Sequence, residues 1–375
     1  MSGAASTAEA ADRARPPSLG ATFDPRLNGL NLLRVVLALG VVLWHSFQLS
    51  GARIGWAPAR ILMLSGFVDG FFAISGFLIV RSWDLRPDAR RFLRARVLRI
   101  MPGFWVCLTV VAFVLGPAAA IIQQAPMGRS FVEDELSYVG KNSLLWMFQA
   151  RIAGTPEAGP WNGSAWTLSW EFACYLGVLG LGLAGILLRR SVLPALFATA
   201  LAVLVLTGLP AFDIGILHHA ARFATMFLAG SVIYVVRDRL PARAAWVAGS
   251  LVLVIVATYL PDYRLLGALP LAYACVVSGA LIKVPGLQLR TDLSYGMYIY
   301  AFPVQQLLRT AGLAGKGVPL YFALSVLATL PFAALSWFGV ERPAQRWGRR
   351  PRPLVADPPE EAVAAAPPRR LDPIR

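Results

Sequence analysis

The sequence predicts an all-α, polytopic membrane protein. Of its 375 residues, 57% are hydrophobic and only 15% are charged, whereas soluble domains carry about 25% charged residues. The mean hydropathy is +0.60, and helix-length apolar runs recur along the chain. The three cysteines, Cys107, Cys174 and Cys275, lie within such runs, so they predict neither a disulfide framework nor a metal site.

We expect about ten transmembrane helices, because ten apolar runs are long enough or nearly long enough to cross about 30 Å of hydrocarbon. They lie near residues 30–49, 61–81, 103–122, 165–188, 192–208, 216–236, 244–260, 263–283, 293–312 and 318–340. Residues 1–25 are polar and lack a signal-peptide core, and residues 349–375 are rich in Pro, Ala and Arg. We therefore expect one membrane domain at 26–348 between two disordered cytoplasmic tails.

The distribution of positive charge predicts the topology. The net charge is +15, and Lys and Arg gather in the amino-terminal tail and in alternate connections between the runs, such as 81–99 and 342–352. By the positive-inside rule, this alternation places both termini in the cytoplasm and favours an even number of spans. The excess charge is therefore mostly topological, and nucleic acid is not an expected partner.

The first span, residues 30–49, carries Arg34 and His45. Eleven residues are close to three helical turns, so both side chains lie on one helix face, about 16 Å apart. An ionisable group within a membrane helix costs about 2.5 to 3.5 kcal/mol on insertion scales, which makes each residue a functional-site hypothesis. The alternative is that Arg34 extends to the lipid headgroups while His45 donates a structural hydrogen bond.

An arginine-rich segment between the second and third spans, residues 81–99, predicts an interfacial helix. Its members Arg96 and Arg99 are three residues apart and share a helix face. Planar guanidinium groups suit bidentate binding of phosphate oxygens. Charge alone favours the alternative, in which this helix lies on anionic lipid.

Further candidate residues lie in the second and fourth spans. Ser75 and Gly76, in the second span, either permit close helix packing or let a ligand approach the backbone. Glu171 lies about two turns into the fourth span, near the depth expected of His45. Pairing with Glu171 would fix the tautomer of His45 and raise its basicity; the alternative partner for Glu171 is Arg222.

Taken together, these residues resemble acyltransferase family 3, the integral membrane enzymes that include O-antigen, exopolysaccharide and Nod-factor O-acetyltransferases. The motifs, in the order of the family, are Arg34 with His45, FFAISGF at 71–77, Arg96 with Arg99 before Pro102, WTLSWEFACY at 166–175, LSYGMYIY at 293–300 and VERP at 340–343. They cover roughly residues 27–345. Two features depart from the family: Ala301 stands where members often carry a histidine, and no extracellular SGNH-type esterase domain follows the last span.

The resemblance implies transfer of an acyl group, usually acetyl from acetyl-CoA, to a hydroxyl of an extracytoplasmic glycan or glycolipid at the bacterial inner membrane. The implied donor site comprises Arg34, Arg96, Arg99, Ser75 and Gly76. We expect His45 to act as general base, oriented by Glu171, with a covalent acyl-histidine as the competing mechanism. Arg222, Tyr295, Tyr298 and Glu341 occupy family-type positions without a role derived from the sequence, and no metal is expected.

Two other classes of protein share some of these features. A transporter or flippase of a lipid-linked saccharide would also have about ten spans and buried charges, but it would not need a cytoplasmic arginine cluster aligned with one membrane histidine. A structural subunit of an assembly that makes envelope polysaccharide is the third possibility. The sequence specifies neither the acceptor hydroxyl, nor the acyl chain length, nor the oligomeric state.

Overall fold

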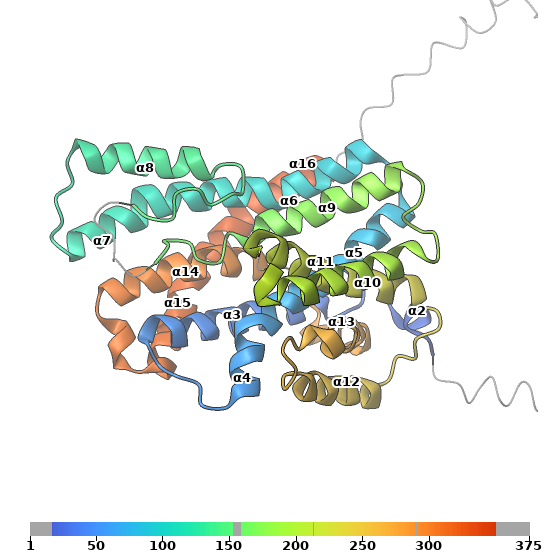
Figure 1. Ribbon diagram of the computed structural model, residues 1–375. Coiled ribbons are helices and arrows are strands. Elements are labelled where there is room, and N and C mark those ends of the chain that lie inside the picture. Colours follow the sequence, from blue (N-terminus) through green and yellow to red (C-terminus); the bar gives the residue numbers. More distant parts are fainter. Residues whose placement is uncertain (1–16, 153–158, 213, 290, 350–375) are drawn as a thin grey trace, which may run out of the picture.

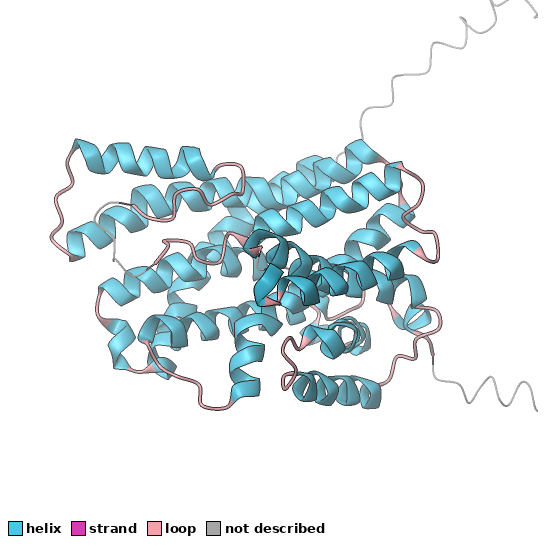
Figure 2. Cartoon of the chain, viewed as in Figure 1, coloured by secondary structure: helices cyan, strands magenta, loops and turns pink. Residues whose placement is uncertain are grey.

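A computed structural model describes residues 17–152, 159–212, 214–289 and 291–349. The regular structure in these ranges is helical apart from one isolated bridge between Ser18 and Pro241 (Figure 2). The all-α class is therefore confirmed. Most of the two expected tails lies outside the described residues, but residues 17–25 are ordered: helix α2 (Leu19–Thr22) buries Leu19 completely and bonds to the Leu240 carbonyl.

The remaining α-helices follow one another along the chain, and the longest connection between them runs from α8 to α9 (Figure 1). They are α3 (Leu30–Ser50), α4 (Ala57–Ile61), α5 (Phe67–Leu85), α6 (Ala89–Val110), α7 (Gly116–Ile122), α8 (Arg129–Asn142), α9 (Thr167–Leu183), α10 (Val192–Thr207), α11 (Gly215–Val236), α12 (Ala244–Ala257), α13 (Arg264–Leu281), α14 (Ser294–Thr310), α15 (Val318–Ser336) and α16 (Arg342–Arg349). Three π-helical turns, at Leu62–Gly66, Val111–Leu115 and Trp337–Glu341, join or extend them.

The polytopic architecture is supported, whereas the expected number of about ten spans is not confirmed. Within the described residues, six helical stretches are long and apolar enough to cross a membrane: Leu30–Ser50, Ala57–Leu85, Ala89–Ile122, Gly215–Val236, Arg264–Leu281 and Val318–Gly348. Helices α9, α10 and α12 are apolar but shorter. Helix α14 is buried along most of its length, so it faces protein rather than lipid and needs no continuous apolar surface.

The arginine-rich segment does not form a separate interfacial helix. Residues 89–99 make up the first half of α6, which Asp88 caps by accepting a hydrogen bond from the Arg91 amide (2.8 Å). The helix then continues through Pro102 without ending. A proline inside a membrane helix is tolerated where neighbouring groups satisfy the carbonyl that it leaves free.

Helices α5 and α11 cross at very close range. A Cβ atom added to Gly76 would lie 1.9 Å from the Phe227 carbonyl oxygen, and one added to Gly230 would lie 1.8 Å from the Ala73 carbonyl oxygen. Only glycine permits such an approach of two backbones. This crossing fixes α5 in the centre of the bundle, beside α3.

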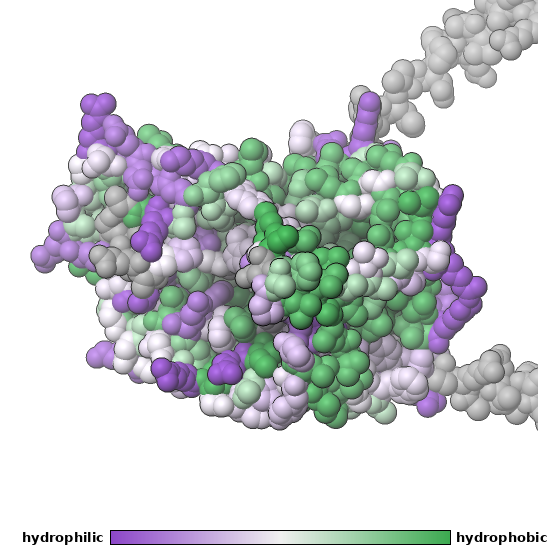
Figure 3. Space-filling view, in the orientation of Figure 1, coloured by the Kyte–Doolittle hydropathy of each residue, from purple (hydrophilic) through white to green (hydrophobic). Residues whose placement is uncertain are grey.

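The surface matches a bundle whose flanks meet hydrocarbon. Figure 3 shows a broad apolar face over the region of α9 to α12. Hydrophilic side chains gather at the left end, near α7 and α8, and along the right edge of the same view. The long helices run between these two polar ends, as a membrane-spanning bundle requires.

Candidate active site

Arg34 and His45 lie on a face of α3 that borders two cavities inside the bundle. His45 lines one of about 190 Å³, the His45 cavity, and Arg34 lines one of about 30 Å³, the Arg34 cavity. Val68, Thr167 and Tyr298 contribute to the walls of both. The two cavities are therefore neighbours along α3, with the side chains of a helical stripe pointing into them.

The imidazole of His45 is available to a ligand. Its ring meets Phe302 edge-on, with 4.7 Å between centroids, and makes no hydrogen bond to the described residues. Behind it, the Gln305 amide donates to the Val42 carbonyl (3.0 Å) and to the Ser46 hydroxyl (2.9 Å), which fixes α3 against α14. The protein thus holds the helix firmly and leaves the ring nitrogens free.

Arg222 enters the His45 cavity from α11. Its Nε lies 3.7 Å from Oδ1 of the fully buried Asp69, and among the described residues neither of these atoms has a hydrogen-bond partner. The other oxygen of Asp69 accepts from Arg264 Nε (2.7 Å) and from the Tyr263 hydroxyl. Arg222 therefore lies close to a carboxylate that Arg264 already neutralises, and it is not the partner of Glu171.

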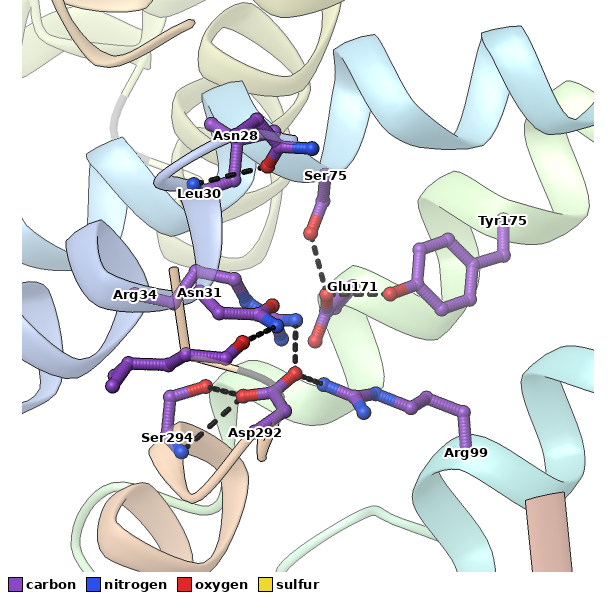
Figure 4. Close-up of polar contacts among 11 residues, drawn as sticks. Asn28, Leu30, Asn31, Arg34, Ser75, Arg99, Glu171, Tyr175, Asp292 and Ser294 are labelled. Atoms are coloured by element: carbon purple, nitrogen blue, oxygen red, sulfur yellow. Dashed lines mark hydrogen bonds and ion pairs between the residues drawn. The ribbon is translucent and has the colours of Figure 1, made fainter. Parts of the chain in front are cut away.

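Asp292 holds the two arginines beside the Arg34 cavity (Figure 4). Its Oδ2 accepts from Arg34 Nη1 (2.6 Å) and Arg99 Nη2 (2.5 Å), and its Oδ1 accepts from Ser294. Burial disfavours the ionised form, but the two guanidinium groups and Ser294 outweigh it and hold the pKa of Asp292 below its usual value. Arg34 and Arg99 are thus both bonded to one carboxylate within the protein.

Glu171 lies at the Arg34 cavity and not at the His45 cavity. Its Oε1 accepts from the hydroxyls of Ser75 (2.8 Å) and Tyr175 (2.5 Å) (Figure 4). The expected pairing with His45 is absent from the described residues. The prediction that Glu171 lies at the depth of His45 was wrong because α9 begins at Thr167 inside the bundle and not at the membrane surface. Glu171, one turn further along α9, therefore lies deeper than His45.

The remaining donor-site candidates differ in what surrounds them. Ser75 reaches Glu171, whereas the space beside Gly76 is filled by the backbone of α11, so packing accounts for this glycine. Arg96 donates to the Ser82 hydroxyl (2.7 Å), and its guanidinium lies 5.2 Å from the Phe92 ring and 5.8 Å from the Tyr175 ring. Arg96 therefore points into the protein and not toward a lipid surface.

The family-type tyrosines and Glu341 stabilise the elements around the cavities. The Tyr295 hydroxyl donates to the Ile100 carbonyl (2.7 Å) of α6, and the Tyr298 hydroxyl bonds to Thr167 (2.5 Å). Glu341, in a π-helical turn, accepts from the Ser336 hydroxyl (2.8 Å), while its Oε2 is buried with no hydrogen-bond partner among the described residues. Glu341 makes no ion pair with an arginine in the described part of the chain.

The family model described as an acyltransferase domain matches residues 27–338 of the sequence. The chain belongs to acyltransferase family 3. It is similar to a protein named O-acetyl transferase from Shigella phage Sf6, with 26% identity over 335 residues that cover 84% of this chain and 95% of the relative. It is also similar to Nodulation protein 10 of Rhizobium leguminosarum bv. viciae, with 25% identity over 355 residues, 85% of this chain and 93% of the relative. No solved structure matches it.

This acyltransferase contains site residues that sequence reasoning missed. Asp69 and Arg264 lie within expected spans, so the insertion cost that singled out His45 was a signal for them as well. Asp292 precedes its helix and gave no such signal. Among the described residues, no group of three or more His, Cys, Asp or Glu side chains could hold a metal ion.

A buried polar loop completes the His45 cavity of this acyltransferase. Pro303 has no N–H, so the Ile299 carbonyl in α14 lacks a helical donor, and Asn162 Nδ2 donates to it (3.1 Å). The Ser164 hydroxyl donates to the Tyr298 carbonyl (2.9 Å). These bonds hold the segment before α9 inside the bundle, which is possible because irregular backbone at this depth is enclosed by protein.

Proposed function

We propose that this acyltransferase moves an acetyl group from cytoplasmic acetyl-CoA to a hydroxyl of an extracytoplasmic carbohydrate or glycolipid. The enzyme would lie in a bacterial inner membrane with both termini in the cytoplasm. The observation that carries the proposal is the position of His45, an unbonded imidazole in a cavity that adjoins a second, arginine-lined cavity along the same helix. The name of the phage relative, O-acetyl transferase, supports transfer to oxygen.

His45 acts in this proposal as the general base. It takes the proton of the acceptor hydroxyl as the oxygen attacks the thioester carbonyl, so a C–O bond forms. The tetrahedral intermediate then collapses, the C–S bond breaks, and the imidazolium returns its proton to the departing CoA sulfur. No side chain among the described residues fixes the tautomer of His45, so we no longer assign that role to Glu171. A transient acyl-histidine remains the competing route.

Arg222 provides the positive charge for the oxyanion that forms on the thioester carbonyl. It lines the same cavity as His45, and its nearest carboxylate, Asp69, is already paired with Arg264. A preorganised cation in a site shielded from water stabilises developing negative charge more strongly than it would in bulk solvent. We therefore assign the chemical step to His45 and Arg222 together.

The Arg34 cavity is the passage for the acyl arm of the donor. Arg34 and Glu171 line it, and the Ser75 hydroxyl donates a hydrogen bond to Glu171. Its volume of about 30 Å³ equals roughly the share of one water molecule in the liquid, so an incoming thioester must displace side chains there. Arg96 and Arg99 support this wall from α6 through Ser82 and Asp292.

The test is transfer of radiolabelled acetyl from acetyl-CoA to glycolipids of the host membrane by the protein in proteoliposomes. His45→Ala should lower the rate by about 10² to 10⁴, the usual contribution of a general base. His218→Ala is the matched control, because that ring is bonded to Thr207 (3.1 Å) and lines neither the His45 cavity nor the Arg34 cavity. Unchanged transfer by His45→Ala would remove this residue from the chemistry, and saccharide translocation without esterification would identify a transporter instead.

A further inference from the structure

A third cavity, of about 720 Å³, lies where α3 begins and α5 ends. We call it the basic cavity and define it by Phe23, Arg26, Asn31, Arg81, Lys283 and Gln288, which belong to the segment before α3, to α3 itself, to α5 and to the segment after α13. Its volume falls within the range of about 300 to 1,000 Å³ that is typical of small-molecule sites. It adjoins neither His45 nor Glu171.

The described residues that line the basic cavity include three cations and no carboxylate. Within the described part of the chain, the guanidinium groups of Arg26 and Arg81 make no hydrogen bond or ion pair, and that of Arg81 lies 5.5 Å from the Phe23 ring. Lys283 donates to the carbonyls of Thr22 and Leu27, both at 2.9 Å, and so fixes the segment that forms one wall. Unpaired guanidinium groups around a polar space suit phosphate oxygens.

The deeper arginines are poorly placed for this task. Arg99 and Arg34 share Asp292, and Arg96 donates to Ser82 while lying against two aromatic rings. Binding a phosphate through these side chains would require breaking buried hydrogen bonds and exposing Asp292 to a second anion. Arg26 and Arg81 face no such cost.

The position of the basic cavity along α3 also matches the order of the parts of coenzyme A. Asn31 on its wall comes three residues before Arg34 and fourteen residues before His45 on α3, which is about 21 Å of helix at 1.5 Å per residue. The order along α3 is therefore basic cavity, Arg34 cavity, His45 cavity. Coenzyme A has the same order, with a phosphorylated nucleotide, an extended pantetheine arm and a terminal thioester.

We propose that the basic cavity binds the phosphorylated nucleotide of the acyl-CoA donor, with Arg26 and Arg81 on its phosphates. This inference rests on the proposed function, because it takes acyl-CoA as the donor. In this assignment Arg26 and Arg81, and not Arg96 and Arg99, bind the phosphates. Arg96 and Arg99 instead stabilise the helices around the Arg34 cavity.

The test is equilibrium binding of CoA, 3′-dephospho-CoA and pantetheine to the full chain in nanodiscs of neutral phosphatidylcholine. The double variant Arg26→Ala, Arg81→Ala should bind CoA about ten- to a hundredfold more weakly, because hydrogen bonds to charged groups are lost. It should also lose the preference of the wild type for CoA over 3′-dephospho-CoA, while pantetheine binding stays unchanged. Arg86→Ala, which removes an exposed arginine outside the cavity, should bind like the wild type.

Four results would overturn the assignment, and they are distinguishable. If the double variant binds CoA as the wild type does while the wild type transfers acetyl, the cavity assignment falls and the proposed function stands. If the wild type binds no CoA, the proposed function falls first. If the CoA affinity of the double variant differs from that of the wild type only in nanodiscs that contain anionic lipid, the cavity binds a lipid headgroup and not a nucleotide. Equal loss of pantetheine and CoA binding would indicate a structural defect and would also contradict the assignment.

Discussion

Two buried aspartates, Asp69 and Asp292, each lie beside two arginines, and they differ in how completely their oxygens are used. Both oxygens of Asp292 accept hydrogen bonds, from Arg34, Arg99 and Ser294. Asp69 receives its hydrogen bonds on one oxygen only, and among the described residues its other oxygen has no hydrogen bond. The carboxylate of Asp292 is therefore hydrogen-bonded through both oxygens, whereas that of Asp69 is hydrogen-bonded through one.

This difference separates arginines that support the fold from an arginine that is available to a substrate. A buried charge without a partner is costly, whereas a fully paired cluster is merely neutral or modestly stabilising. Arg34, Arg99 and Arg264 are therefore needed to balance the carboxylates beside them. Arg222 is held near Asp69 without a hydrogen bond, so its charge is available in the His45 cavity.

The largest effect on stability should come from Asp292→Ala. This change leaves two guanidinium groups buried without their carboxylate, which typically costs about 3 to 5 kcal/mol. We expect a clear drop in the thermal unfolding midpoint of the purified protein in detergent. Glu133→Ala is the control, since it removes a carboxylate from an ion pair whose side chains are 93% and 62% exposed, and such pairs contribute little. Equal midpoints for both variants would show that the Asp292 cluster is not needed for the fold.

Arg222→Ala should act on catalysis rather than on folding. Loss of one donor to an oxyanion typically lowers kcat by about 10² to 10³, equivalent to about 2.7 to 4 kcal/mol. The variant should unfold near the wild-type temperature because no hydrogen bond of Arg222 Nε is lost, and Arg222→Lys should recover part of the rate. Arg264→Ala, by contrast, strips the hydrogen-bonded partner from Asp69 and should unfold readily. If Arg222→Ala unfolds as readily as Arg264→Ala, the two arginines have the same structural role.

The smallest of the three effects is expected for Gly76→Ala. The added methyl group would meet the Phe227 carbonyl, and overpacking of this kind costs about 1 to 3 kcal/mol. The KM for acetyl-CoA should stay unchanged, since α11 fills the space beside this glycine. Gly177→Ala in α9 is the matched control, because its Cβ would have no neighbour within 4 Å. A raised KM with unchanged stability would return Gly76 to the donor path.

The sequence by itself determined the class of the protein and the stripe on its first long helix. Composition and repeated apolar runs indicated a polytopic, all-α membrane protein, and six motifs in order indicated the family. The position of Arg34 and His45 on one face followed from helix periodicity, which is a local property of the backbone and does not depend on the neighbours.

Only the tertiary structure decided which side chains meet. Arg34 and Asp292 are 258 residues apart in the sequence, and no local rule relates them. Glu171 was assigned to the wrong depth because the start of α9 is set by a buried loop, which Asn162 and Ser164 hold to the carbonyls of α14. The depth at which each helix begins depends on such distant hydrogen bonds, so the contacts between helices could not be read from apolar runs alone.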